Sequence, residues 1–175
     1  MFPSLILALR EGLEAALVIS ILLGALRKFN QKQMYPVIWA GTAAAVALSL
    51  AVALALNWLG TEFEGTGEQV FEGITMLAAA GLLTWMIFWM SKQSRKLKPG
   101  LENDVRAATS HPGVFSLFSL ALVSVVREGT ELAIYLVAAR LASDALQTIL
   151  GATVGLAFAI VLGWLLFTTS YRMNL

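Results

Sequence analysis

Long apolar stretches separated by short polar connectors fill most of the chain. A helix needs about 20 mainly apolar residues to cross a bilayer, and five of these stretches are long enough. They lie at about 4–26, 36–59, 70–90, 114–138 and 147–169. A β-barrel would instead show short alternating strands, and other backbone exposed to lipid would leave its polar groups unpaired. The pattern therefore predicts an all-α fold, a polytopic membrane helix bundle of five transmembrane helices in a single domain, 1–175.

Composition agrees with this prediction. The 175 residues are 58% hydrophobic and 13% charged, whereas soluble proteins have roughly 25% charged residues. The absence of cysteine excludes disulfides, thiolate metal sites and cysteine nucleophiles. A net charge near zero gives no reason to expect binding to nucleic acid. The N-terminus lacks the basic region of a cleavable signal peptide, so we expect the first helix to be retained.

The charges in the connectors predict the orientation of the helices. The first connector has Arg27, Lys28 and Lys32 and no acid, and the third, between 90 and 114, has more basic than acidic residues. The second connector, between 59 and 70, has glutamates and no base. Because cytoplasmic connectors are rich in lysine and arginine, the N-terminus is expected outside the cytoplasmic (plasma) membrane and the C-terminus inside.

Two of the predicted helices contain the same charged pattern, Arg10-Glu11-Gly12-Leu13-Glu14 and Arg127-Glu128-Gly129-Thr130-Glu131. A charged residue at the centre of a membrane helix costs about 2.5–3.5 kcal/mol by insertion scales, so such residues are functional by default. Three helices make up one period, an odd number, and the second copy therefore crosses the membrane in the opposite direction. This indicates an inverted three-helix repeat with a site near the midplane. The second repeat is incomplete, so either the chain is truncated, or a partner or a second copy of the chain supplies a sixth helix.

The spacing within each motif assigns a role to each residue. The two glutamates are three residues apart and project from nearly the same face of the helix, and the arginine lies four residues before the second glutamate. The glycine lets another backbone or an ion approach closely. The candidates are therefore the metal ligands Glu11, Glu14, Glu128 and Glu131, the charge-tuning residues Arg10 and Arg127, and the close-approach residues Gly12 and Gly129.

Four carboxylates against two guanidinium groups leave a formal charge of −2 if the motifs meet. Such a site suits a hard, multivalent cation, because carboxylate oxygens select hard ions over soft ones. Two other interpretations stay open at this point. Each motif could be an ion-pair cluster that fixes the registry of the helices, or the acids could relay protons.

A second acidic set lies on the predicted outer side: Glu62, Glu64, Glu68 and Glu72. Glu68 and Glu72 are four residues apart and share a helix face, and we predict that both bind metal. Clustered negative charge raises the local concentration of cations, so the set is interpreted as a funnel at the outer mouth. The alternative, favoured for Glu62 and Glu64, is a solvated acidic loop.

Three segments together resemble the high-affinity iron permeases, the oxidase-dependent ferric iron transporters of fungi and bacteria. They are the run Arg-Glu-Gly-Leu-Glu-Ala-Ala-Leu-Val-Ile at 10–19 (the REGLE motif), Arg-Glu-Gly-Thr-Glu at 127–131, and Phe71-Glu72-Gly73-Ile74-Thr75-Met76 followed by Leu83-Thr84-Trp85-Met86-Ile87-Phe88-Trp89-Met90. The resemblance covers essentially the whole chain. Family members have seven helices with the N-terminus outside, and this sequence lacks the last two.

The resemblance implies a permease that takes up ferric iron, with iron as transported substrate and no cofactor. It also implies an extracytoplasmic partner, a ferroxidase or peroxidase-type protein, and identifies Glu11, Glu14, Glu128 and Glu131 as the translocation ligands. A homo-oligomer in the lipid bilayer is a further expectation. The rival enzyme hypothesis is a membrane-embedded di-iron carboxylate oxidase, against which the absence of histidine from the predicted helices argues. The third hypothesis is a structural membrane subunit that does not transport.

Overall fold

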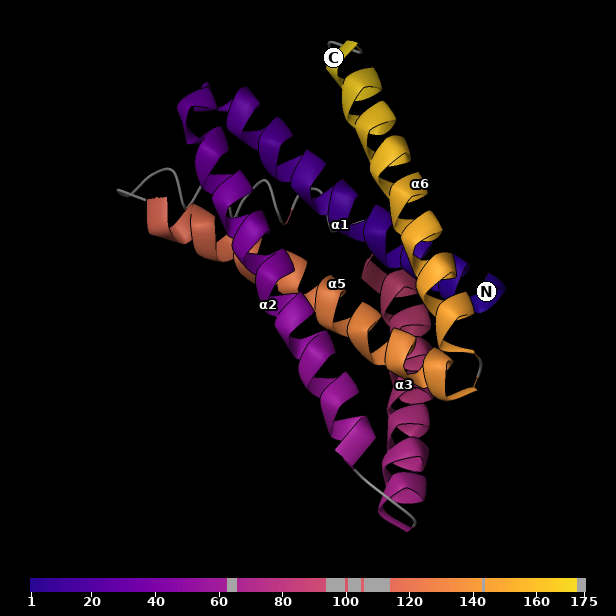
Figure 1. Cartoon of the computed structure of the whole chain (residues 1–175). Coiled ribbons are helices and arrows are strands. Elements are labelled where there is room, and N and C mark those ends of the chain that lie inside the picture. The colour runs from indigo at the N-terminus through magenta and orange to yellow at the C-terminus, as the bar shows by residue number, and fades with distance from the viewer. Residues whose placement is uncertain (63–65, 94–99, 101–104, 106–113, 143, 173–175) are drawn as a thin grey trace.

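The computed structural model describes residues 1–62, 66–93, 100, 105, 114–142 and 144–172. The described residues form five long α-helices and one short 3-10 helix, and no strand occurs among them (Figure 1). The elements are α1 (Phe2–Lys28), η1 (Lys32–Met34), α2 (Tyr35–Glu62), α3 (Thr66–Gln93), α5 (Val114–Ala142) and α6 (Ala145–Arg172). The prediction of an all-α bundle of five helices is confirmed.

Each α-helix is longer than the apolar stretch that predicts it, because helical hydrogen bonding continues into the polar flanks. At the start of α1 a proline, Pro3, lies in the first turn, where its missing N–H costs no hydrogen bond. At the end of α1, Arg27 and Lys28 lie at the negative end of the helix dipole, which favours cations. Asn30 then adopts a positive φ of 59°, and the chain turns into η1.

The helices expose large apolar side chains. Phe2, Leu77 and Phe115 are 78%, 76% and 79% exposed, as expected for surfaces that face lipid. Within the described residues, three helices are long and apolar enough to cross a membrane by length and composition: Lys32–Leu59, Gln69–Phe88 and Ala145–Leu165. Helices α1 and α5 are of similar length, and the charged motifs interrupt their apolar sequences. The chain is a polytopic membrane protein.

Helices α1 and α5 lie against each other and run in opposite directions (Figure 1). The most extensive contacts of the bundle, however, are between α1 and α6 and between α2 and α5. Because α5 and α6 are the first and second helices of the second repeat, each first helix packs against the second helix of the other half. This exchange is what a pseudo-twofold axis in the membrane plane produces, and it supports the inverted repeat.

Glycines let the helices of the two most extensive contacts, α1 with α6 and α2 with α5, approach each other closely. A Cβ atom added at Gly41 of α2 would lie 2.7 Å from the Phe118 carbonyl oxygen and 3.0 Å from Ala121 Cβ of α5. In the other half, a Cβ atom at Gly151 of α6 would collide with Ser4 Oγ of α1. Small residues at such contacts are typical of closely packed membrane helices. The two first helices are therefore held in equivalent ways, each by close contact with the second helix of the other half.

A buried apolar cluster fixes α1 against the beginnings of α2 and α5. It consists of Val18, Leu22, Leu23, Ala25, Leu26, Ile38, Val105, Leu117 and Ala121. On α1 these residues follow the charged motif, and on α5 they precede it. Because packed interiors tolerate little sliding, the cluster sets the axial position of one motif relative to the other.

Candidate metal site

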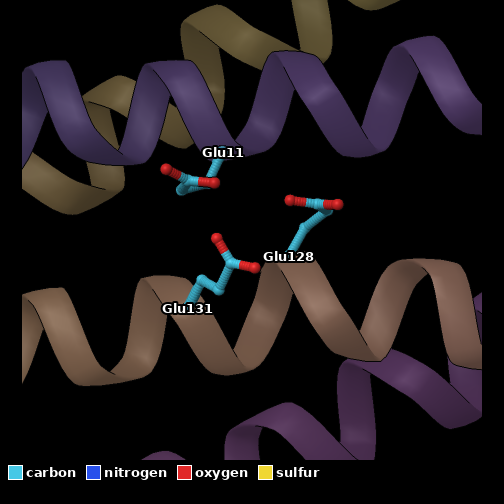
Figure 2. Close-up of side chains that lie close together, drawn as sticks. All are labelled: Glu11, Glu128 and Glu131. Atoms are coloured by element: carbon cyan, nitrogen blue, oxygen red, sulfur yellow. The ribbon is translucent and has the colours of Figure 1, made fainter. Parts of the chain in front are cut away.

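Carboxylates from the two motifs converge where α1 passes α5 (Figure 2). Glu11 points from α1 toward α5, while Glu128 and Glu131 point from α5 toward α1. One carboxylate oxygen from each of the three lies within 4.8 Å of the others. We call these three residues the carboxylate cluster. The inverted repeat predicts this meeting of the two motifs.

The carboxylate cluster is largely withdrawn from the protein surface. Glu11 is 1% exposed and Glu128 is 8% exposed, and the side chain of Glu131 is 13% exposed. Both carboxylate oxygens of Glu11 and the Oε2 atom of Glu128 are buried without a hydrogen-bond partner among the described residues. Buried charges in proteins are normally paired or coordinate a metal, so these oxygens are positioned to bind a cation.

Each arginine pairs with a glutamate of its own motif. The Nε atom of Arg127 donates a hydrogen bond to Glu131 Oε1 at 3.1 Å, and Arg10 Nε lies 3.3 Å from Glu14 Oε1. Arg10 Nη1 also lies 3.4 Å from Glu11 Oε1, an ion pair that does not give this oxygen a hydrogen bond. The arginine–glutamate pairing at a spacing of four residues is confirmed in both motifs.

Glu14 takes a different position from Glu131, its counterpart in the second motif. It is half-buried and lines an open pocket formed by residues of α1 alone. Its oxygens are not part of the carboxylate cluster, although Glu14 interacts electrostatically with Glu131. The structure therefore brings three of the four motif glutamates together and leaves the fourth, Glu14, beside them.

The motif glycines lie at close helix contacts. A Cβ atom at Gly12 would lie 2.6 Å from Ala159 Cβ of α6, and one at Gly129 would lie 2.6 Å from Ser49 Cβ of α2. The atoms that come close to both glycines belong to side chains of the opposing helix, whereas the sequence predicts the approach of a backbone or an ion, so that role stays a prediction. Because the glycines face α6 and α2, the adjacent glutamates Glu11 and Glu128 are turned toward the cluster.

Of the acids predicted for the outer mouth, Glu72 is the one whose side chain is described, and it is not part of the carboxylate cluster. Glu72 is half-buried near the start of α3, a helix whose main contact is with α5. The side chains of Glu62 and Glu68, and all of Glu64, lie outside the described residues. The funnel at the outer mouth therefore stays a prediction. The basic third connector, whose charge predicts the orientation, also lies mostly outside the described residues.

Two buried hydroxyl groups near the motifs are not singled out by the sequence pattern. The Ser49 Oγ and Tyr135 Oη atoms are buried and have no hydrogen-bond partner among the described residues. For Tyr135 a signal exists, because it lies four residues after Glu131 and hence on the same face of α5. For Ser49 the sequence has no such signal, since its neighbour Gly129 comes from another helix.

The geometry of the carboxylate cluster suits a hard cation. Oxygens bound to Mg²⁺ or Ca²⁺ lie about 2.0–2.6 Å from the ion, so two oxygens that share one ion are at most about 5 Å apart. The oxygens of the cluster meet this limit. Carboxylates also select for hardness, and two glutamates per arginine leave the paired motifs with negative charge. The site can hold a multivalent cation between two helices.

A membrane helix bundle with buried carboxylates between two inverted halves is the architecture of an ion-transporting membrane protein. The comparison with protein families agrees with this class. The whole chain, residues 1–175, matches the iron permease FTR1 family, and the chain belongs to that family. The resemblance stated for the motifs is therefore confirmed at the level of the family.

Curated relatives match along the whole chain. The ferrous iron permease EfeU of Escherichia coli O157:H7 is 39% identical over 178 residues, which cover 100% of this chain and 64% of the relative. The ferrous iron permease EfeU of Yersinia pestis is 33% identical over 177 residues, covering 100% of this chain and 63% of the relative. The chain thus spans just under two thirds of the length of these relatives. No solved structure matches it significantly. The family and the relatives are named as permeases, which are transporters rather than enzymes.

Proposed function

We propose that this chain carries iron ions across the membrane through the carboxylate cluster. Iron is the transported substrate, and no cofactor takes part. Glu14 serves as a further ligand beside the cluster, and Arg10 and Arg127 moderate the negative charge so that binding is strong enough to load and weak enough to release. The convergence of buried carboxylates from two antiparallel helices is the observation that carries the proposal, together with the three oxygens of Glu11 and Glu128 that have no hydrogen-bond partner among the described residues.

The route follows from the distribution of charge. Glu68 and Glu72 gather cations on the outer side of the cytoplasmic membrane and raise their local concentration. The ion then passes to the carboxylate cluster near the midplane and leaves toward the cytoplasm. This direction rests on the basic connectors, which predict the N-terminus outside and the C-terminus inside. A homo-oligomer of the chain stays part of the proposal.

The proposal also specifies the oxidation state of the transported iron. The relatives are named ferrous iron permeases, whereas the resemblance of the motifs implies ferric iron supplied by an extracytoplasmic ferroxidase or peroxidase-type partner. We take Fe(III) as the ion that enters the site, because a cluster of carboxylates favours the harder ion. Uptake measured separately with Fe(III) citrate and with ascorbate-reduced iron distinguishes the two states.

Radioactive iron uptake tests the proposal. Cells that lack their own iron uptake systems express the protein or its Glu128→Gln variant, and the initial uptake rate is measured at equal protein levels in the membrane. Glutamine has nearly the same shape as glutamate but lacks its charge. Loss of groups in the outer shell of a metal site typically costs about 10–100-fold, so a direct ligand should cost at least about tenfold in uptake.

The matched control is Asp144→Asn, which also removes one carboxylate. Asp144 is exposed and accepts a hydrogen bond from the Leu146 N–H at the start of α6 at 3.3 Å, and asparagine caps helices equally well. Uptake by this variant should match that of the unmodified protein. Equal uptake by Glu128→Gln and Asp144→Asn would overturn the assignment of the cluster as the transport site.

A further inference from the structure

Tyr135 is a fully buried polar residue that the proposed function leaves without a role. It lies on α5, is 1% exposed, and its Oη atom has no hydrogen-bond partner among the described residues. A buried hydroxyl without a partner is unfavourable, and such groups in native proteins mark either a missing ligand or a functional site. Its position decides between these explanations.

The position of Tyr135 places its phenol next to the carboxylate cluster. Tyr135 follows Glu131 by four residues, so the two share one face of α5. Long side chains on a helix lean back toward its N-terminus, which directs the phenol over the turn that carries Glu131. The phenol interacts electrostatically with Glu11 most strongly and with Glu131 next. It therefore approaches both helices of the cluster.

The corresponding residue of the first repeat is Val18. It follows Glu14 by four residues, as Tyr135 follows Glu131, and it is 9% exposed within the apolar core. An apolar residue thus fills this position in one half, so the packing of the repeat does not require a hydroxyl there. The phenol is an addition to the α5 half alone.

We propose that the Tyr135 phenol oxygen is a fourth ligand of the ion held by Glu11, Glu128 and Glu131. This inference rests on the proposed function and specifies its site further. If each of the three carboxylates binds through one oxygen, the cluster supplies three ligand atoms to a hard cation that prefers about six. A phenol oxygen is hard and can ligate iron. On binding, the O–H bond breaks, an O–Fe bond forms, and the proton is released to water, as expected when a metal binds a protonated ligand. A negatively charged phenolate favours Fe(III) over Fe(II).

Iron binding to the purified protein tests this inference. The protein in detergent is titrated with Fe(III) nitrilotriacetate, and two quantities are measured: bound iron by elemental analysis after gel filtration, and visible absorption. Iron bound by a phenolate gives a charge-transfer band in the visible region, and iron bound by carboxylates alone does not. We expect the band in the unmodified protein. We expect Tyr135→Phe to lose it while still binding iron, with affinity at least about tenfold weaker.

The matched control is Tyr35→Phe, because Tyr35 lies at the start of α2 and packs against the apolar core. This variant should bind iron as the unmodified protein does and should show the same charge-transfer band. A band that survives in Tyr135→Phe, or iron that binds to the unmodified protein without any band, would overturn the inference and leave the proposed function standing. Binding of Fe(II) but not Fe(III) would overturn both the inference and the choice of Fe(III), and would leave the transport of iron through the cluster standing. Failure of the unmodified protein to bind iron in either state would overturn the proposed function itself.

Discussion

In the α1 half of the site Glu11 points into the carboxylate cluster and Glu14 lines an open pocket, whereas in the α5 half both Glu128 and Glu131 join the cluster. Residues three apart on a helix are separated by about 60° around its axis, at 100° per residue. A modest difference in how a helix is turned therefore decides whether one or two of its glutamates reach the partner. Near-identical motifs can thus contribute unequally to one site.

The two halves also differ in the polar groups around the motif. Where the first repeat has Val18, the second has Tyr135, and Gly12 faces Ala159 whereas Gly129 faces Ser49. The hydroxyls of Tyr135 on α5 and of Ser49 on α2 are both buried and without a partner among the described residues. The second repeat supplies two of the three glutamates of the carboxylate cluster, while the first supplies one deeply buried carboxylate. We regard the α5 half as the principal binding half.

The largest effect should separate the equivalent glutamates Glu131 and Glu14. Because only Glu131 belongs to the cluster, Glu131→Gln should lower iron affinity by at least about tenfold. Glu14→Gln should lower it by a smaller factor, since Glu14 acts from beside the cluster. Equilibrium binding of iron to the purified variants measures both. A weaker effect for Glu131→Gln than for Glu14→Gln would show that the two halves have been assigned the wrong way round.

The glycine contacts should give the next largest effect, on stability. Gly12→Ala places a Cβ atom 2.6 Å from Ala159 Cβ, and Gly129→Ala places one 2.6 Å from Ser49 Cβ. Overpacking of this kind costs about 1–3 kcal/mol, so both variants should unfold at lower temperature in detergent. The substitutions Ala159→Gly and Ser49→Gly should each rescue only the variant of their own pair. Rescue by the wrong partner, or by neither, would contradict the exchanged packing of the helices.

The arginines should produce a smaller effect. Arg10 forms ion pairs with Glu11 and Glu14, and Arg127 forms an ion pair with Glu131. Partly exposed ion pairs have modest energies, equivalent to about 1.4–5-fold in an equilibrium constant. Arg10→Gln and Arg127→Gln should therefore each tighten cation binding a few-fold and slow release. Binding and uptake measured together check this, and weaker binding in both variants would indicate a purely structural role.

The smallest effect is expected at Glu72, outside the cluster. Glu72→Gln should leave the maximal uptake rate nearly unchanged and raise the iron concentration needed for half-maximal uptake. The difference should shrink at high salt, because salt screens attraction between exposed charges. Uptake curves at two ionic strengths measure this. A fall in the maximal rate that is independent of salt would place Glu72 in the translocation path itself.

Much of the architecture could be predicted from the sequence. Apolar length predicts the five helices, and the odd number of helices per repeat predicts that Glu11 and Glu128 meet across antiparallel helices. Periodicity does not determine how far a helix is rotated about its own axis, and the separate positions of Glu14 and Glu131 depend on that rotation. The contact of Ser49 with Gly129 depends on the packing of α2 against α5. The residue pattern of one helix does not show which other helix it packs against.

The central claim is that Glu11 of α1 and Glu128 of α5 hold the same ion. A double-mutant cycle on iron affinity tests it directly, with Glu11→Gln, Glu128→Gln and the combined variant measured in the same membrane preparation. Ligands that share one ion are not independent, so the combined variant should lose little more affinity than the more severe single variant. If the losses of the two single variants instead multiply in the combined variant, the two glutamates act independently and the shared site is wrong.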